Sequence, residues 1–190
     1  MGAVSTAPLP ESRLATAPAL ERPDLLAPPV AAALRADPAL AAQVLVAEID
    51  PGLADTADFC AAYDVRPEES ANCVVVAGRR GDRTTLAACV VLATTRADVN
   101  GAVRRRLDAR RASFAPMDDA VGRSGMEHGG ITPVGLPAGW PVLVDGAVAA
   151  AGPVVVGSGL RRSKLVLDGR LVAALPGAEV LDGLGRPAGA

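Results

Sequence analysis

The 190-residue chain is long enough for one folded domain, since domains cluster near ~100–150 residues. Half of the residues are hydrophobic but only 2% are aromatic, so we expect a core of alanine, valine and leucine. The formal net charge of -2 excludes a general nucleic-acid coat protein, which needs many basic residues to neutralise phosphates, although it leaves room for a local basic patch. Only one of the 19 basic residues, Lys164, is a lysine.

The histidine and cysteine content excludes a zinc site of the usual four-ligand kind. His128 is the only histidine, and Cys60, Cys73 and Cys89 are far apart and never form a C-x-x-C pair. Their odd number and apolar neighbours indicate buried reduced thiols, so we expect a cytoplasmic protein. The first twenty residues lack the pattern of a signal peptide, and no apolar run reaches the ~20 residues that span a bilayer, so we expect no membrane association.

The N-terminal part of the chain changes character after about twenty residues. Residues 1–22 are rich in alanine, proline, serine and threonine without periodicity, which predicts a disordered or loosely packed arm. Residues 23–190 are predicted to form a single domain. Within it, paired prolines predict a helix over 28–36, Asp37 is expected to cap a second short helix, and 43–49 is a strand candidate.

The middle of the chain combines a helix, a hairpin and a second helix. Asp55 is expected to cap a helix that ends at Tyr63. Two runs rich in valine, leucine and alanine, 71–78 and 83–95, are joined by a short turn with glycine and predict a hairpin of largely buried strands. A helix is expected over 98–111, with its arginines facing solvent.

The C-terminal half mixes short elements around a long irregular segment. We expect a strand at 112–116, a helix at 117–121 and irregular chain over 122–139. Further strand candidates follow at 140–148, 152–159, 163–169 and 177–184. Because strands and helices intermix without regular alternation, the predicted fold class is a mixed, largely antiparallel α/β domain.

Aromatic side chains are too few to form an RNA-stacking platform. Phe59, Tyr63, Phe114 and Trp140 are the only ones, and we expect all four in the core. Any recognition of RNA would then be local rather than through stacked rings.

The glycine-rich segment 125–139 carries the clearest signal for chemistry. Its consecutive glycines allow backbone N–H groups to approach a carbonyl or phosphate oxygen closely, as in oxyanion holes. His128 is a candidate general base because its ordinary pKa lies near neutrality, and Glu127 is its only neighbour that could orient it. The alternative is a plain connecting loop in which His128 binds a ligand or lies at the surface.

A second candidate segment is the small-residue corner at 157–159, which is followed by Arg161, Arg162 and Lys164. Such a trio could hold tRNA phosphates. It could equally be a solvated basic strand edge that prevents edge-to-edge pairing, and the sequence leaves both interpretations open. No P-loop or dinucleotide-binding fingerprint is present.

The order of these segments over residues 43–184 resembles the YbaK/EbsC family. The likeness rests on DTADFCAAYDV, SANCVVV, RADVNGAVRRRL, GMEHGGITPVGLP, WPVLVDGAV, VVVGSG and AEVLDGL, in that order. This aminoacyl-tRNA deacylase superfamily includes the editing insertion of bacterial prolyl-tRNA synthetases. The resemblance implies a barrel-like mixed sheet with flanking helices, and hydrolysis in trans of the ester between a wrong amino acid and the tRNA 3′ end.

The same resemblance implies the partners and site residues. It requires no metal or other cofactor, and it names the aminoacyl-tRNA 3′ end as substrate and an aminoacyl-tRNA synthetase as a further candidate partner. Backbone amides at Gly129, Gly130 and Ile131 would stabilise the oxyanion. The substrate-binding set would comprise His128, Thr132, Pro133, Gly135, Ser158 and Gly159.

One position departs from the family pattern. Where the family has a lysine in a segment close to I-A-K-[ST]-L-V, this chain has Asn72. Loss of one charged donor to an oxyanion would cost roughly 2–4 kcal/mol of transition-state stabilisation. The sequence therefore supports two hypotheses, a deacylase that uses Asn72, or a catalytically weak module that binds an aminoacyl or nucleotide ligand or a protein partner. It also leaves open that Lys164 takes the place of the missing lysine in space.

Overall fold

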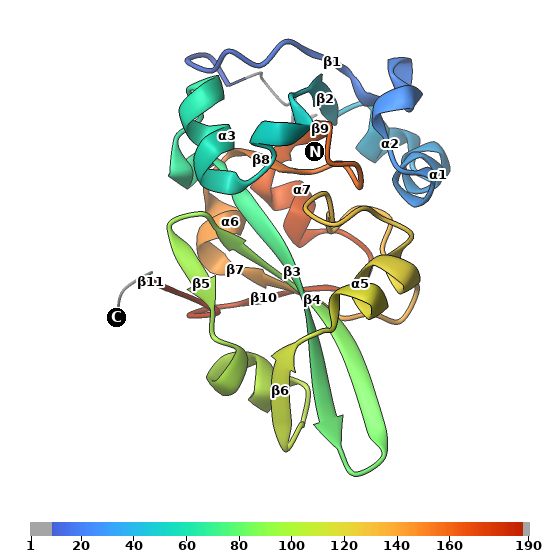
Figure 1. The fold of residues 1–190 in the computed structure, drawn as a ribbon, viewed down its shortest axis with the longest axis vertical. Helices are drawn as coiled ribbons and strands as arrows, with labels where there is room; N and C mark the ends of the chain where they lie inside the picture. Colours follow the sequence, from blue (N-terminus) through green and yellow to red (C-terminus); the bar gives the residue numbers. More distant parts are fainter. Residues whose placement is uncertain (1–8, 188–190) are drawn as a thin grey trace.

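The computed structural model describes residues 9–187 of the chain (Figure 1). Its strands are β1 (Thr16–Pro18), β2 (Leu45–Glu48), β3 (Ala71–Arg80), β4 (Arg83–Leu92), β5 (Thr95–Ala97), β6 (Arg111–Phe114), β7 (Val142–Asp145), β8 (Pro153–Gly157), β9 (Ser163–Asp168), β10 (Ala178–Leu181) and β11 (Gly185–Pro187). Its α-helices are α1 (Pro28–Ala36), α2 (Pro38–Ala41), α3 (Thr56–Tyr63), α4 (Arg104–Arg106), α5 (Met117–Ser124), α6 (Gly146–Ala150) and α7 (Gly169–Ala173). Short 3-10 turns lie at Ala19–Glu21, Pro23–Leu25, Pro51–Leu53 and Pro67–Glu69, and a π-helical turn, Val99–Val103, precedes α4.

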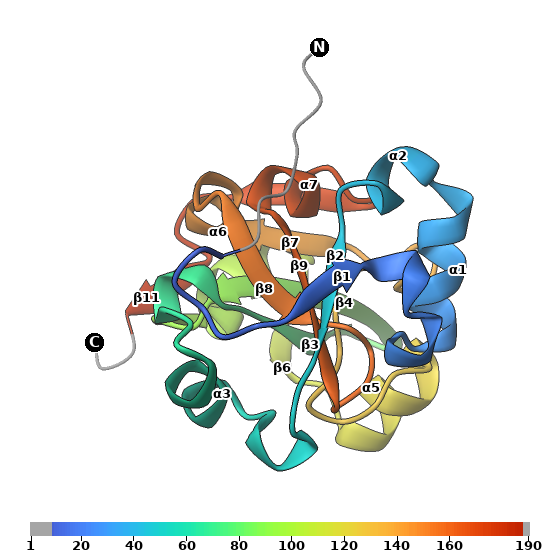
Figure 2. The same ribbon diagram turned by 90° about the horizontal axis from the view of Figure 1, so that it is seen from above.

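Two sheets pack together to form the body of the domain. One has the strand order β10-β7-β4-β3-β6, the other β1-β2-β9-β8, and β11 pairs with β5 separately. Only the β10/β7 and β7/β4 pairs are parallel. Figure 2 shows β1, β2, β9 and β8 running side by side across the molecule. The predicted mixed, largely antiparallel α/β class is confirmed, but the two sheets stay open and do not close into a barrel.

Strand β4 explains why the hairpin sequence is almost continuously apolar. Its alternate residues Val90 and Leu92 belong to the central core between the two sheets. The intervening Cys89 and Val91 pack on the opposite face, in a cluster with Val103 from the turn before α4. Because successive side chains of a strand point to opposite faces, a strand covered on both sides shows no apolar-polar alternation.

The outer face of the four-stranded sheet is covered by α3 and by the N-terminal segment. Phe59 of α3 packs with Val155 and Val166 in a third cluster that also contains Leu9. Strand β1 pairs with β2, which places Thr16 opposite Ala47. The expectation of a loose arm over residues 1–22 is therefore wrong from Leu9 onward, because its sparse apolar residues find partners on the sheet. Residues 1–8 lie outside the described part.

Two of the three predicted aspartate caps, Asp37 and Asp98, form side-chain hydrogen bonds at the start of a helix. Asp37 accepts a hydrogen bond from the Leu40 amide at 3.0 Å at the start of α2. Asp98 accepts from the Gly101 and Ala102 amides, although the helical segment that it begins ends at α4 and residue 111 already belongs to β6. Asp55 occupies the first cap position of α3 without making a side-chain cap hydrogen bond.

The strand predicted over 140–148 is shorter in the structure. Strand β7 ends at Asp145, whose carboxylate accepts a hydrogen bond from the Ala147 amide at 2.9 Å and so begins α6. Asp168 does the same at the end of β9, where it begins α7. Both aspartates stop a β-strand because a side-chain cap supplies the hydrogen bond that a following helix needs.

The aromatic residues and cysteines do not all occupy the core. Phe59 is buried, Tyr63 and Trp140 are half-buried, and Phe114 is 62% exposed, so the prediction that all four aromatic residues belong to the core holds only for Phe59. Phe114 belongs to β6, which lies at the edge of the sheet and therefore has a neighbouring strand on one side only. Cys60, Cys73 and Cys89 are free, as expected, but only Cys89 is buried, so the prediction of buried thiols is wrong for the half-buried Cys60 and Cys73. No helix within residues 9–187 has the length and apolar character needed to cross a membrane.

The two sheets diverge along one edge of β3. Strand β6 pairs only with Val76–Arg79, so within residues 9–187 no strand lies beside β3 from Ala71 to Val75 on that edge. There β3 approaches β8 instead, with an isolated bridge between Ser70 and Val155. The glycine-rich segment closes the opening between the sheets on one side, and a hollow lined by several of the candidate residues lies there.

Candidate functional site

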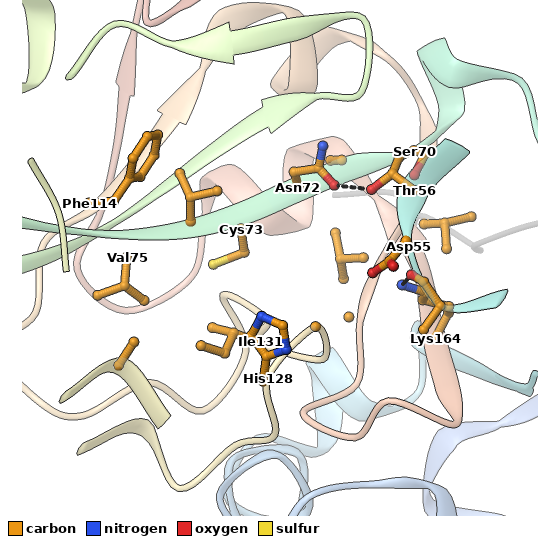
Figure 3. A pocket seen from close by; sticks show the side chains of 18 of the residues that line it. Asp55, Thr56, Ser70, Asn72, Cys73, Val75, Phe114, His128, Ile131 and Lys164 are labelled. Carbon is orange, nitrogen blue, oxygen red and sulfur yellow. Dashed lines mark hydrogen bonds between the residues drawn. The ribbon is translucent and has the colours of Figure 1, made fainter. Parts of the chain in front are cut away.

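A cavity of about 390 Å³ lies between the free edge of β3, strand β8 and the glycine-rich segment (Figure 3). It is lined by Ala54, Asp55, Thr56, Ser70, Ala71, Asn72, Cys73, Val74, Val75, Phe114, Ala115, Met117, Ala120, His128, Gly129, Ile131, Val155, Val156, Gly157 and Lys164. Most of these side chains are apolar, and the few polar groups come from four separate parts of the chain. The cavity has the size and composition of a small-molecule or nucleotide-end site.

Glycines position the floor of this cavity by allowing backbone to pack on backbone. The Gly159 amide donates to the Gly130 carbonyl, and the Glu127 amide donates to the Gly159 carbonyl, both at 2.8 Å. A Cβ atom on Gly157 would lie only 2.3 Å from the Gly130 oxygen. The segments 127–131 and 157–161 can therefore approach this closely only with glycine at the contact.

The hydrogen bonds within this floor decide which amides remain available. The Gly130 amide already donates to the Glu127 carbonyl at 3.0 Å, so it is not a free oxyanion donor in this structure. Gly129, with a φ of 77°, and Ile131 both line the cavity, and neither amide donates to another described residue. Of the three backbone amides expected to stabilise an oxyanion, those of Gly129 and Ile131 remain available.

Asn72 lies on β3 at the opposite wall of the cavity. Its side-chain oxygen accepts a hydrogen bond of 2.7 Å from the Thr56 hydroxyl at the start of α3 (Figure 3). Its amide nitrogen makes no hydrogen bond to the described residues, so two N–H donors remain. Thr56 was not among the residues predicted from the sequence, and its place beside Asn72 depends on how α3 packs on the sheet.

Lys164 projects from β9 into the same cavity and is almost fully buried, with 9% of its surface exposed. Its ammonium donates to the Ala54 carbonyl at 3.0 Å and lies 5.1 Å from the centre of the Phe59 ring. Burial, followed by the positive charge of Arg161, lowers the pKa of Lys164 below its usual value. The cavity therefore does contain one lysine, although not at the position of Asn72.

The two arginines that precede Lys164 make different contacts. Arg161 donates to the Pro51 carbonyl at 2.9 Å and pairs with Asp55 at 3.3 Å. Arg162 donates to the Asp24 carbonyl at 2.6 Å. The trio is neither a shared phosphate site nor a simple solvated edge, because its members point into three different surroundings.

His128 is exposed at the mouth of the cavity, near Ile131 (Figure 3). It makes no hydrogen bond to the described residues. The neighbouring Glu127 carboxylate accepts from the Arg161 amide at 2.6 Å, which leaves it engaged with the opposite loop rather than with the imidazole. The structure thus brings His128 to the cavity but does not pair it with an orienting carboxylate.

The remaining five residues of the predicted substrate-binding set do not line the cavity. Thr132 and Ser158 are fully buried, and the Ser158 hydroxyl bonds to the Ser163 hydroxyl at 2.7 Å. Gly159 packs against Ala27. Pro133 and Gly135 line a separate hollow of about 500 Å³. Thr132, Ser158 and Gly159 pack within the loops that form the cavity floor. The sequence alone could not distinguish this packing role from contact with substrate.

Cys73 also lines the cavity, but its chemistry is suppressed. Burial raises the pKa of this thiol well above its ordinary value. Since the thiolate is the nucleophilic form, Cys73 contributes an apolar surface rather than a reactive group. Asp55 is the carboxylate at the rim, and its ion pair with Arg161 keeps it next to Thr56 and Lys164.

The described part of the chain contains no cluster of metal ligands. Among residues 9–187, no three His, Cys, Asp or Glu side chains come together in a way that could hold an ion. What the cavity offers instead is two free backbone amides, one ammonium group and one carboxamide around an apolar space. These groups can stabilise an anion that develops on a bound carbonyl, and they can orient a water molecule.

The comparisons with known proteins concern the family and the fold of the chain. A family profile described as "Aminoacyl-tRNA editing domain" matches residues 50–174. A proposed trans-editing enzyme for prolyl-tRNA synthetase has a similar structure, with a TM-score of 0.71, 20% identity, and coverage of 85% of this chain and 97% of that one. A hypothetical protein, APE2540, has a TM-score of 0.65 at 20% identity, with coverage of 74% and 90%. A search of curated proteins found no match.

Proposed function

Because the chain belongs to the aminoacyl-tRNA editing domain family, we propose that it hydrolyses, in trans and in the cytoplasm, the ester that joins a wrong amino acid to tRNA. One observation carries the proposal. The cavity brings the unpaired amides of Gly129 and Ile131 into the same space as the Lys164 ammonium and the Asn72 carboxamide. Ester hydrolysis needs such donors, since negative charge develops on the carbonyl oxygen.

The reaction joins water to the ester carbonyl carbon and then breaks the bond from that carbon to the ribose oxygen. The ribose oxygen leaves with a proton, and the amino acid leaves as a carboxylic acid. The Gly129 and Ile131 amides would hold the carbonyl oxygen as it becomes negative. His128 would accept the proton that water releases, since it lies at the mouth of the cavity with both ring nitrogens unpaired.

Lys164 would supply the positive charge that the family lysine supplies from β3. Its ammonium is held by only one hydrogen bond, to the Ala54 carbonyl, which leaves N–H donors for a substrate oxygen. In a largely apolar cavity a single charge acts on a developing anion more strongly than it does in water. Asn72, fixed by Thr56, would orient the attacking water or the ribose.

Under the second hypothesis the protein binds the same ligand but does not hydrolyse it. His128 has no carboxylate to orient it, and Asn72 stands where the family has lysine. These two observations favour a module that binds an aminoacyl or nucleotide end without hydrolysing it. Both hypotheses use the same cavity, so only a measurement of ester hydrolysis separates them.

The test is a panel of correctly and wrongly charged tRNAs incubated with the purified protein, with loss of the ester followed over time. Proline-specific tRNA charged with other amino acids comes first, because the solved structure with a TM-score of 0.71 is described as serving prolyl-tRNA synthetase. We expect accelerated hydrolysis of at least one wrong ester and none of the matched correct one. Saturable binding with no acceleration on any member, at high protein concentration, would establish the binding module instead.

A further inference from the structure

Outside the cavity, positive charge is concentrated in one stretch of the chain. Residues 79–111 carry nine arginines and three aspartates, a formal charge of +6 in a chain whose total is -2. This stretch forms the end of the β3–β4 hairpin, the turn with α4, and β6, which together make the lower end of the molecule in Figure 1. All nine arginines are exposed, and we call five of those that form no ion pair the arginine face: Arg79, Arg83, Arg105, Arg110 and Arg111.

The arginine face differs from the other arginines in what surrounds it. Several arginines elsewhere hold carboxylates, as Arg66 holds Glu69 and Arg170 holds Asp168. No side chain of the arginine face forms an ion pair within residues 9–187. Of the neighbouring acidic groups, Asp108 is taken by Arg80. The charge of this face is therefore left uncompensated by the protein.

The strand register brings these charges together. Arg79 of β3 lies directly opposite Arg111 of β6, and Arg80 lies opposite Arg83 across the hairpin. Like charges directly opposite each other on neighbouring strands are destabilising. The arrangement costs stability to the free protein, and a bound polyanion would remove that cost.

A path connects the arginine face to the cavity. A second hollow of about 390 Å³ is lined by Arg79 and Arg111 together with Asn100, Ser113 and Phe114. Phe114 lines the cavity as well, so the two hollows share this residue. Phe114 is 62% exposed, so this apolar side chain is available for contact with a ligand.

We propose that the arginine face binds the phosphate backbone of the tRNA acceptor stem while Phe114 stacks against a base near the 3′ end whose ester enters the cavity. The inference rests on the proposed function and adds where the RNA lies. Arginine suits phosphate because its planar group donates in pairs. An aromatic ring suits an unstacked base because every base has a face to stack on.

Binding of RNA can be measured without any hydrolysis. The probe is a fluorescein-labelled acceptor-stem hairpin RNA that ends in CCA-3′, titrated with protein at several salt concentrations. We expect Arg79→Ala with Arg111→Ala to weaken binding at least ~10-fold at low salt and to lower the slope of log affinity against log salt by about 1–2, one for each arginine that no longer neutralises a phosphate. The matched control is Arg35→Ala in α1, an exposed arginine without an ion pair among the described residues.

The outcomes separate this proposal from the proposed function. Unchanged hairpin binding in the double variant would overturn it and leave the arginine face for an acidic protein partner. An equal loss in Arg35→Ala would also overturn it, because overall charge would then explain the binding. If wild-type protein binds the hairpin through these arginines but hydrolyses no ester, the surface stands and the deacylase fails.

Phe114 gives an independent readout. Phe114→Ala should weaken hairpin binding roughly 5- to 150-fold, the range expected for loss of one stacked base, and Phe114→Trp should restore it. The side chain is exposed, so neither change should disturb folding. Hydrolysis of 3′-O-aminoacyl adenosine, which has no acceptor stem, should be unaffected by the arginine substitutions. Equal binding by the alanine and tryptophan variants and wild type would remove Phe114 from the RNA path.

Discussion

The cavity and the arginine face present opposite solutions to the recognition of one charged substrate. The cavity contains a single buried ammonium, Lys164, within a largely apolar lining, and its remaining donors are backbone amides and the Asn72 carboxamide. The arginine face is exposed, uncompensated and directed at solvent. The first arrangement suits the chemistry of a developing anion, and the second suits attraction of a polyanion.

The difference teaches how a protein of net charge -2 can act on RNA. Exposed charges act over distance but are screened by salt, with a Debye length of about 8 Å at physiological ionic strength. A buried charge is screened far less, so one lysine there can have a larger effect on rate than several arginines at the surface. Substitutions in the cavity should change turnover, and substitutions on the arginine face should change affinity and its dependence on salt.

The largest effect is expected from Lys164→Met. Loss of one charged donor to the oxyanion should lower kcat/KM about 10²–10³-fold. Stability should change by no more than about 1 kcal/mol, because methionine fills the space of the lysine chain while the cost of burying a charge disappears. The rate of ester loss and the urea midpoint test these two statements. A full rate in the folded variant would remove Lys164 from the reaction.

Gly157→Ala should come next, through geometry rather than charge. The new Cβ would lie 2.3 Å from the Gly130 oxygen and 2.6 Å from the Ile131 oxygen, so the cavity floor must move. We expect a loss of ~10–100-fold in kcat, since misplacement by about 1 Å can cost that much. Gly122→Ala is the matched control, because a Cβ there meets nothing within 4 Å and alanine stabilises a helix by about 1 kcal/mol.

A charge exchange tests whether the cavity needs one cation at either of two positions. Asn72→Lys introduced into the Lys164→Met protein should recover about 10-fold of the lost rate, because a single positive donor near the oxyanion accounts for most of that loss. Asn72→Gln in the same background is the control that keeps the carboxamide. If the lysine and glutamine variants hydrolyse the ester equally slowly, the two positions are not equivalent.

The smallest effect is expected from pH. Burial and the charge of Arg161 lower the pKa of Lys164, so the folded protein releases this proton at lower pH than the unfolded chain does. Between the two pKa values the unfolded chain binds more protons, and stability should rise with pH. At the lower end of this interval, where only part of the ammonium is lost, the deacylation rate should fall by a few-fold. Lys164→Met should show neither change once spontaneous ester hydrolysis is subtracted.

The sequence predicted the elements better than it predicted the site. The hairpin, the aspartate-capped helices and the position of the glycine-rich segment followed from local patterns that the fold obeys. The sequence could not show that the Gly130 amide donates to the Glu127 carbonyl, or that Ser158 is buried. Both depend on how segments 127–131 and 157–161 pack together.

The position of Lys164 in the cavity is a second feature that the sequence alone could not predict. The resemblance points to β3, where Asn72 replaces a lysine, while the lysine of this chain reaches the cavity from β9. No spacing along the chain relates these two strands, since they belong to different sheets. Phe114 is expected in the core because it is apolar, and only its edge strand explains its exposure.

The central claim is that the cavity and the arginine face act separately, and a double-mutant cycle tests it most directly. The cycle compares kcat/KM on one charged tRNA for wild type, Lys164→Met, the Arg79→Ala/Arg111→Ala variant and their combination. Independent regions predict that the free-energy effects add within about 0.5 kcal/mol. A coupling energy above about 1 kcal/mol would contradict the account, because it would place the arginines in the same interaction as the reacting ester.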